Sequence, residues 1–248
     1  MARGARRLVI ANRASVRELS LSMMLKKLTP RYMVGAGDVD VTTAFAASYL
    51  RLPADQKRMF RLLGLHPGAD FDSYGAAALY GTEPDEAERL LEALLDGHLL
   101  EDRGANRYAF HDLLRVHART TANAVESPDA RRLALNRLLD YYLATSTAAA
   151  DLITAGRQRP DGKAHRPDGV ARPPREGPRL AAAADAVAWM AAEHRALLAA
   201  AALSAEYQLA NHTHQLSRNL APYLTMDSHI EDTGNLREPA TRVTETAR

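Results

Sequence analysis

Apolar residues recur at helical spacing through most of this 248-residue chain. The clearest pattern begins at Pro84 and ends at Gly97, and its apolar positions follow the i, i+3, i+4, i+7 spacing of one helix face. These positions are Ala87, Leu90, Leu91, Leu94 and Leu95. Weaker stripes before it predict three shorter helices, over residues 38–52, 53–63 and 72–79.

A short segment with strand-like residues follows the Pro84 helix. His98–Glu101 and Tyr108–Phe110 read as two short strands, and Gly104–Asn106 between them has the composition of a turn. The sequence therefore predicts a β-hairpin after a series of helices. This order of elements is typical of a winged-helix domain, which we assign to residues 38–125.

Helical patterns return after the hairpin. Residues 112–123 are predicted to be helical, and residues 126–155 form a longer connecting helix with an inner face of Leu135, Leu138, Leu139 and Tyr142. Residues 156–180 are rich in Pro, Gly and Arg and have almost nothing apolar to bury, so we predict a disordered linker. Residues 181–248 contain two further stripes and predict an αα-hairpin, the unit of helical repeat arrays. The first stripe is Val187, Met190, His194, Leu197, Leu198 and Ala201, and the second is Leu209, Thr213, Leu216, Leu220 and Leu224.

Composition narrows the class of protein. Ala and Leu dominate while aromatic residues make up 6% of the chain, which favours a mainly α fold. The chain contains no Cys, which excludes a disulfide framework, thiolate zinc sites and a cysteine nucleophile, and fits a reducing cytoplasm. No run approaches the roughly 18 uninterrupted apolar residues of a membrane span. We therefore expect a mainly α, cytoplasmic protein that does not contact a membrane.

The distribution of charge argues against DNA binding through the predicted winged helix. The net charge is only +2, and the helix in the recognition position is acidic. Its acidic residues are Asp85, Glu86, Glu88, Glu92 and Asp96, against the lone Arg89. DNA phosphates repel such a helix, and the hairpin offers only Arg103 and Arg107 as cations. The basic residues concentrated in residues 1–31 could bind nucleic acid non-specifically, although such a run is more often a solvated segment.

Few residues indicate chemistry. No serine lies in a Gly-x-Ser-x-Gly turn and no phosphate-binding Gly-x-x-x-x-Gly-Lys-Ser/Thr loop is present, so we expect no enzyme activity. His212 and His214 lie at i and i+2 and point in different directions on a helix, so we expect no metal site. The one candidate is His111, at a strand-to-helix corner where Asp112 suits the helix N-cap. Helix N–H groups and an anionic ligand would converge there; the alternative is that His111 merely caps or packs.

Three segments resemble a family of bacterial regulators. They are Phe60–Asp72 (Phe-Arg-Leu-Leu-Gly-Leu-His-Pro-Gly-Ala-Asp-Phe-Asp), Phe110–Arg115 (Phe-His-Asp-Leu-Leu-Arg) and Trp189–His194 (Trp-Met-Ala-Ala-Glu-His). They are similar to the region that follows the ATPase core in STAND-class NB-ARC transcription regulators, where a winged helix precedes tetratricopeptide repeats. Many members begin with an OmpR-like DNA-binding domain and an activator domain. The resemblance implies a non-catalytic regulatory segment, with residues 1–37 as the remnant of the ATPase helical subdomain and residues 181–248 as the start of a tetratricopeptide-like array.

The same resemblance gives His111 a role. In the family, the winged helix carries a Met-His-Asp motif whose His approaches the β-phosphate of bound ADP, and Phe110-His111-Asp112 matches it with Phe in place of Met. His111 is therefore the implied ADP phosphate sensor. ADP or ATP is implied only together with a complete NB-ARC core, and the implied partners are proteins, bound through the helical repeats or the ATPase core. The alternative function is a stand-alone transcription regulator that binds DNA through the winged helix.

Overall fold

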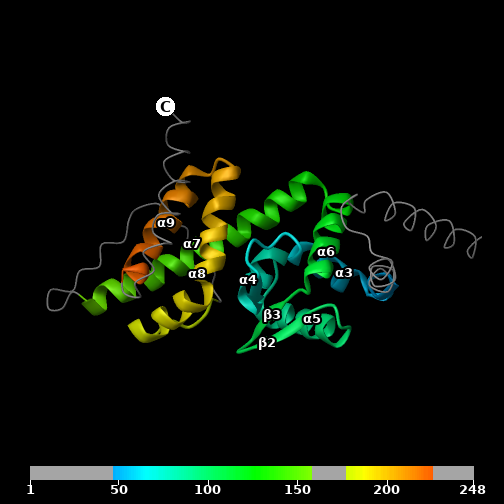
Figure 1. The fold of residues 1–248 in the computed structure, drawn as a ribbon, viewed down its shortest axis with the longest axis horizontal. Coiled ribbons are helices and arrows are strands. Elements are labelled where there is room, and N and C mark those ends of the chain that lie inside the picture. The colour runs from blue at the N-terminus through cyan, green and yellow to red at the C-terminus, as the bar shows by residue number, and fades with distance from the viewer. Residues whose placement is uncertain (1–46, 158–176, 226–248) are drawn as a thin grey trace, which may run out of the picture. The chain divides into compact units, whose positions relative to one another are not determined.

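The computed structural model describes residues 47–157 and 177–225. This part of the chain is mainly helical with one small sheet, as predicted (Figure 1). Its helices are α3 (Ala54–Leu63), α4 (Ser73–Tyr80), α5 (Pro84–Asp96), α6 (Asp112–Val125), α7 (Pro128–Arg157), α8 (Ala183–Glu206) and α9 (Ala210–Leu224). Its strands are β1 (Asp70–Asp72), β2 (Glu101–Gly104) and β3 (Arg107–Ala109). The predicted remnant over residues 1–37 and most of the predicted linker lie outside the described residues.

α3, α4 and α5 begin and end close to where the sequence predicts, whereas most of the helix predicted over residues 38–52 lies outside the described residues. Pro53 is the N-cap of α3, and Asp72 caps α4 by accepting a hydrogen bond from the Gly75 N–H at 2.7 Å. α4 ends at Gly81, whose φ of 85° is a conformation that glycine adopts without steric cost. Pro84 occupies the first turn of α5, and the predicted apolar face is confirmed, because Ala87, Leu90, Leu91 and Leu94 are fully buried.

Three short antiparallel strands form the sheet, in the order β1-β3-β2. The predicted hairpin of β2 and β3 is confirmed, but its first strand begins at Glu101 instead of His98. His98 has a left-handed backbone with a φ of 54°, and its N–H donates to the Leu95 carbonyl at 2.9 Å, so it closes α5. The sequence pattern does not predict β1, because its three residues hold a single apolar side chain, Phe71, which pairs in register with Tyr108.

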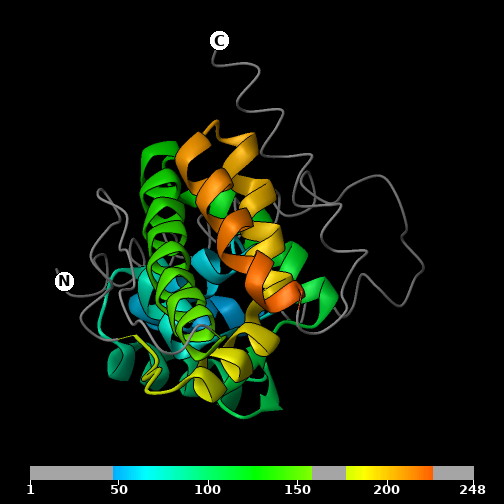
Figure 2. The ribbon, with the colours of Figure 1, turned by 90° about the vertical axis from the view of Figure 1, so that its left-hand side faces the viewer.

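The helices α7, α8 and α9 pack against one another in all three pairs, and Figure 2 shows them side by side. The predicted inner face of α7 is buried. The predicted face of α8 is partly wrong: Glu193 is buried, whereas Val187 and His194 are only half-buried. Because α8 contacts both α7 and α9, its buried face is wider than a single stripe. That face includes alanines with little periodic signal, which are Ala186, Ala196, Ala200 and Ala201.

One helix in the described part of the chain is long and apolar enough to cross a membrane by length and composition alone. It is α8, and 44% of its 18-residue apolar window is buried within the structure. The core helices of globular proteins pass the same test, and α8 packs between α7 and α9. Its composition is therefore weak evidence for a membrane segment.

Arginine side chains join the elements before the hairpin to the helices that follow it. Arg137 of α7 donates to the carbonyls of Ala78 at 3.0 Å and Leu79 at 2.7 Å, at the end of α4. Arg58 of α3 donates to the Tyr80 carbonyl at 3.2 Å. The last carbonyls of a helix have no partner within the helix. Side chains from α3 and α7 supply those partners, and α4 packs directly against α7.

Candidate functional site

The predicted corner at His111 lies at the start of α6. β3 ends at Ala109, Phe110 is buried, and the chain then turns into the helix. The prediction of Asp112 as the N-cap is wrong: His111 occupies that position, with φ −62° and ψ 143°, and Asp112 is the first helical residue. The reason lies in the backbone, since the carbonyl of the extended His111 already accepts the first helical hydrogen bond, from the Arg115 N–H at 3.0 Å. The Asp112 carboxylate still has the favourable charge for the first turn.

His111 is exposed, and its imidazole makes no capping hydrogen bond. In the first two turns of α6, two apolar side chains at i and i+3 spacing are exposed, Leu113 by 40% and Val116 by 54%. The opposite face of α6 is buried through Leu114 and Ala118. We name His111, Leu113 and Val116 the corner face. An exposed histidine at a helix N-terminus and exposed apolar side chains in the turns that follow have the character of a docking surface.

The loop between α3 and β1 holds α6 and α8 close to the sheet. A Cβ atom on Gly64 would lie 2.5 Å from the backbone nitrogen of Arg119 on α6, so only glycine permits this approach. A Cβ atom on Gly68 would lie 2.9 Å from the Cβ atom of Ala196 on α8. Arg115 of α6 also donates to two carbonyls of the loop, those of His66 at 3.0 Å and of the following proline at 3.2 Å. The Gly-Leu-His-Pro-Gly run is therefore a junction that contacts two helices distant in sequence.

His66 in this loop begins a buried chain of hydrogen bonds. Its Nδ1 accepts from the Gly68 N–H at 3.1 Å, so we assign the proton of the neutral ring to Nε2. Nε2 then donates to the hydroxyl of Tyr142 on α7 at 2.9 Å. That hydroxyl donates in turn to Oε2 of Glu193 on α8 at 3.2 Å. Side chains from the loop, α7 and α8 thus converge on one buried carboxylate.

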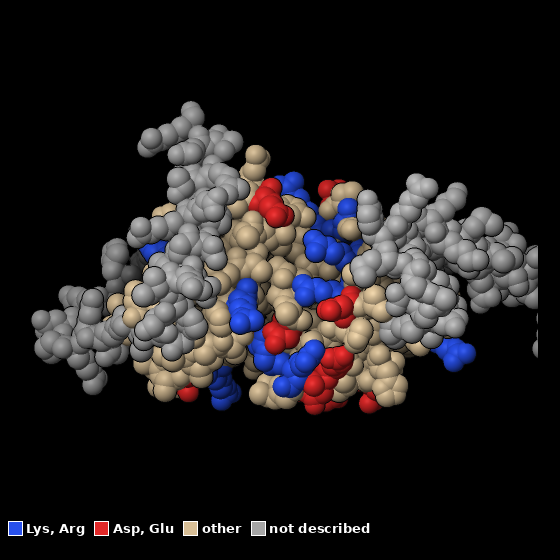
Figure 3. Space-filling view, in the orientation of Figure 1, with Lys and Arg blue, Asp and Glu red and all other residues tan. Residues whose placement is uncertain are grey.

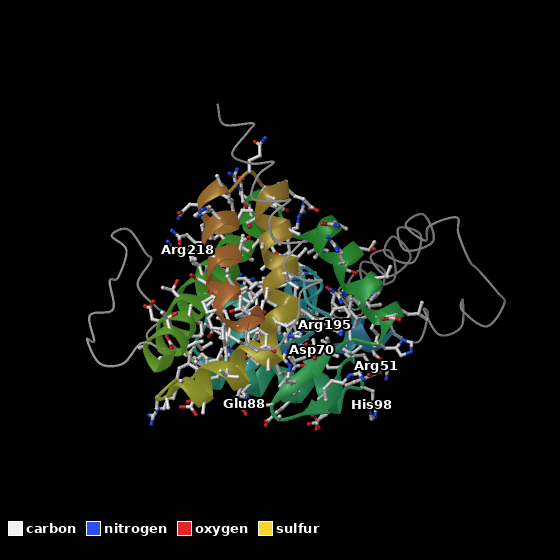
Figure 4. All side chains as sticks on the ribbon, turned by 60° about the vertical axis from the view of Figure 1, so that its left-hand side comes forward. Arg51, Asp70, Glu88, His98, Arg195 and Arg218 are labelled. Atoms are coloured by element: carbon white, nitrogen blue, oxygen red, sulfur yellow. The ribbon has the colours of Figure 1, made fainter. Side chains whose placement is uncertain are left out.

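Arg107 of β3 approaches the same carboxylate from the sheet. One guanidinium nitrogen donates to Glu193 Oε1, and the other donates to Asp70 on β1 at 2.7 Å. The Arg107 side chain is 14% exposed and that of Glu193 is 1% exposed, so the pair is shielded from solvent. Figure 4 shows Asp70 where the sheet meets α8. We name Asp70, Arg107, Glu193, Tyr142 and His66 the junction network.

Burial sets the protonation of the junction network. Burial, together with the nearby Asp72 carboxylate, raises the pKa of Glu193 to about 7 against the lowering effect of Arg107. Burial also lowers the pKa of His66 to about 4, and the positive charges of Arg115 and Arg107 act in the same direction. Burial also acts to lower the pKa of Arg107, but Asp70 and Glu193 outweigh it and keep this pKa above its ordinary value. Near neutral pH, His66 is therefore neutral, Arg107 is a cation and Glu193 titrates.

The other residues singled out from the sequence do not form a site. His212 is hydrogen-bonded to Asp140 at 2.8 Å. No group of three or more His, Asp or Glu in the described ranges is placed to hold a metal ion. Of the two hairpin cations, Arg103 pairs with Glu101 at 2.8 Å and Arg107 is turned inward to the junction network.

Sequence reasoning found His111 but missed the junction network. A signal for Glu193 was present, because it lies four residues after Trp189 and four before Leu197, and both are buried on α8. An acid on an apolar helix face indicates a buried charge with a partner. The partner, Arg107, could not be found in this way because 86 residues separate the two in sequence.

Comparison with known proteins identifies regulatory proteins as relatives of this chain. The chain is homologous to AfsR-type regulatory proteins over about 60% of its length. It is 40% identical over 157 residues to the regulatory protein AfsR of Streptomyces griseus, which covers 61% of this chain and 16% of that protein. It is 37% identical over 164 residues to the regulatory protein AfsR of Streptomyces coelicolor, covering 63% of this chain and 16% of that protein. The chain thus spans about one sixth of the length of these relatives. No protein-family model and no solved structure matches it.

Proposed function

We propose that this chain is a non-catalytic regulatory segment of a transcription regulator and that it couples the nucleotide state of an NB-ARC-type ATPase core to protein contacts. The observation that carries the proposal is the corner face, with His111 exposed at the N-terminus of α6 and Leu113 and Val116 exposed in the first two turns of this helix. Homology to AfsR-type regulatory proteins supports the regulatory role. The element order α3-β1-α4-α5-β2-β3 supports a winged helix, and the packed α8–α9 hairpin supports the start of a tetratricopeptide-like array.

The corner face suits contact with an anion held by another protein surface. The first N–H groups of α6 carry the positive end of the helix dipole, and His111 places a donor beside them. One imidazole and one helix terminus do not suffice to hold a nucleotide, so an ADP phosphate would have to be bound mainly by the core. In this proposal His111 donates to that phosphate, Leu113 and Val116 pack on the core, and loss of the phosphate contact weakens the docking.

The alternative, a stand-alone DNA-binding regulator, has less support. The basic residue of α5, Arg89, is paired with Glu86 at 2.5 Å, while acidic Glu88 and Glu92 remain on the exposed side of this helix. Figure 3 shows acidic and basic side chains interspersed on the face in view, without a continuous basic surface. Tight DNA binding requires many unpaired Lys and Arg along one surface. We therefore propose protein partners in a cytoplasmic setting, bound through the corner face and the α8–α9 hairpin.

Isothermal titration calorimetry with ADP and ATP tests whether this chain binds a nucleotide by itself or only together with an ATPase core. We expect no measurable heat of binding for the chain alone, with or without Mg²⁺, because the described residues contribute a single phosphate contact. Tight, Mg²⁺-dependent binding by the chain alone would contradict the proposal. A gel-shift titration with promoter and random DNA at increasing salt separates the alternative: selective binding at physiological salt supports it, whereas weak, salt-sensitive binding supports only non-specific attraction.

A further inference from the structure

One short segment carries the corner face at one end and the junction network at the other. It runs from Arg107 to His111, and the three residues between them, Tyr108, Ala109 and Phe110, are all buried. β3 is hydrogen-bonded on both sides, to β1 and to β2. An extended segment of this length spans roughly 13 Å at about 3.3 Å per residue. Because Tyr108, Ala109 and Phe110 are buried and β3 is paired as far as Ala109, little room is left for local bending, and a displacement at His111 would be transmitted toward Arg107.

The Arg107 end of this segment contacts α8 and not α7. Arg107 is paired with Glu193, and three residues further along the same helix Ala196 lies against Gly68. α7 is held differently, by packing against α4 and by the hydrogen bonds of Arg137 to the end of α4. Arg107 therefore ties α8 to the sheet, whereas α7, which enters the junction network through Tyr142, is also held on α4 by contacts that do not involve Arg107.

We propose that Arg107 is the positioning residue through which displacement of the His111 corner changes the contact of α8 with the sheet. This inference rests on the proposed function only for the identity of the partner that docks at His111 and displaces it. When the segment moves, the Arg107–Glu193 pair opens and the first half of α8, residues 183–196, loosens from the sheet while α7 stays on α4. The nucleotide state sensed at one end of the domain thus reaches the α8–α9 hairpin that binds partners.

The surroundings of Glu193 permit this opening. A buried carboxylate that loses its cation is costly unless it binds a proton or keeps another donor. Glu193 keeps the Tyr142 hydroxyl, and its pKa of about 7 lets it take up a proton when Arg107 withdraws. The other charged or titratable groups that influence it are Asp72 at the end of β1 and Tyr141 on α7. Asp70 remains as the partner of Arg107.

Because the chain contains no Cys, a single introduced Cys can be labelled selectively, and a bulky label at position 111 can act as an artificial load that displaces the corner. In a His111→Cys variant of the full chain, a bulky maleimide attached to the thiol stands in for a docked partner. We expect hydrogen exchange of the backbone amides in residues 183–196 to rise several-fold on attachment, and exchange in α5 to stay constant. The matched control carries the same maleimide on Glu92→Cys, which is exposed on α5; it leaves residues 183–196 unchanged.

The role of Arg107 is tested by repeating the load in a second background. With Arg107→Met, hydrogen exchange in residues 183–196 is already high before the maleimide is attached at position 111, and attachment raises it little. With Arg107→Lys, which keeps a cation, attachment again raises the exchange rate, by less than in the chain with Arg107. If Arg107→Met fails to fold, Glu193→Gln serves instead: it removes the charge of the Arg107–Glu193 pair but keeps a hydrogen-bond acceptor, so a reduced response to the load is expected in place of its loss. An unchanged exchange rate in the loaded chain, or an equal response with and without Arg107, would overturn the inference. Because this experiment uses no nucleotide and no ATPase core, a negative result would overturn the coupling through Arg107 but not the proposed docking function. Failure of docking, in turn, would not overturn the coupling.

Discussion

Glu193→Gln is predicted to change how the stability of the protein depends on pH. Gln keeps the size of the side chain and can still accept a hydrogen bond from Arg107, but it cannot bind a proton. In the folded protein the pKa of Glu193 is raised from 4.5 to about 7. The folded state therefore holds a proton on Glu193 that the unfolded state releases, throughout the interval between these two values.

The direction and the size of the change in the free energy of unfolding follow from this difference in pKa. The stabilisation that comes from protonated Glu193 is fully present below pH 4.5 and is lost as the pH rises through about 7. One pKa unit corresponds to about 1.4 kcal/mol, so the free energy of unfolding of the wild type should fall by about 3 kcal/mol relative to Glu193→Gln over this interval. Burial also raises the pKa of Asp72, which is present in both proteins, and its repulsion of Glu193 is already included in the Glu193 pKa of about 7.

Urea unfolding followed by circular dichroism at pH 5, 6, 7 and 8 measures this difference directly. The control is Glu92→Gln, which removes one acid from the exposed side of α5. We expect the free energy of wild type minus Glu193→Gln to decrease steadily to pH 7 and then to level off. A difference that is constant, or that increases with pH, would refute the assignment of Glu193 as a buried acid that titrates near neutrality.

Three further predictions concern the junction and DNA. Gly68→Ala should destabilise the protein by about 1–3 kcal/mol, because its methyl group would overlap α8, whereas Gly97→Ala has ordinary contacts and should be tolerated, as measured by calorimetric Tm. Tyr142→Phe should cost about 1–3 kcal/mol in urea unfolding, because His66 and Glu193 lose their shared hydroxyl. Tyr141→Phe should cost less, since that buried hydroxyl has no hydrogen-bond partner in the described structure. Gel shifts should show only unselective binding that disappears with salt.

The sequence predicts those elements whose signal is local. The apolar face of α5 is recoverable because five aliphatic positions repeat at helical spacing between a proline and a glycine. The corner at His111 is recoverable because a strand pattern gives way there to a helix pattern. β1 is not recoverable from the sequence, because a three-residue strand forms only where a neighbouring strand, here β3, pairs with it.

The junction depends on contacts that are distant in sequence, and these could not be predicted. Gly64, His66 and Gly68 appear in the sequence as parts of a family signature, without a physical reason. The structure supplies one: the two glycines admit α6 and α8, and the histidine donates to Tyr142 of α7. Glu193 was expected to be outside the buried stripe of α8, because an Ala-rich helix gives a weak periodic signal and two helices pack on it.

The proposed docking of the corner face on the core of a larger regulator can be tested with a relative of this chain. The most direct test is the affinity of this chain, measured by calorimetry in the presence of ADP, for Streptomyces griseus AfsR from which the segment similar to this chain has been deleted. Val116→Asp on the corner face is compared with Leu133→Asp on α7, because these two apolar side chains are similarly exposed, at 54% and 57%. We predict binding by the wild type and by Leu133→Asp and its loss in Val116→Asp; equal binding by both variants, or no binding by the wild type, would contradict the claim.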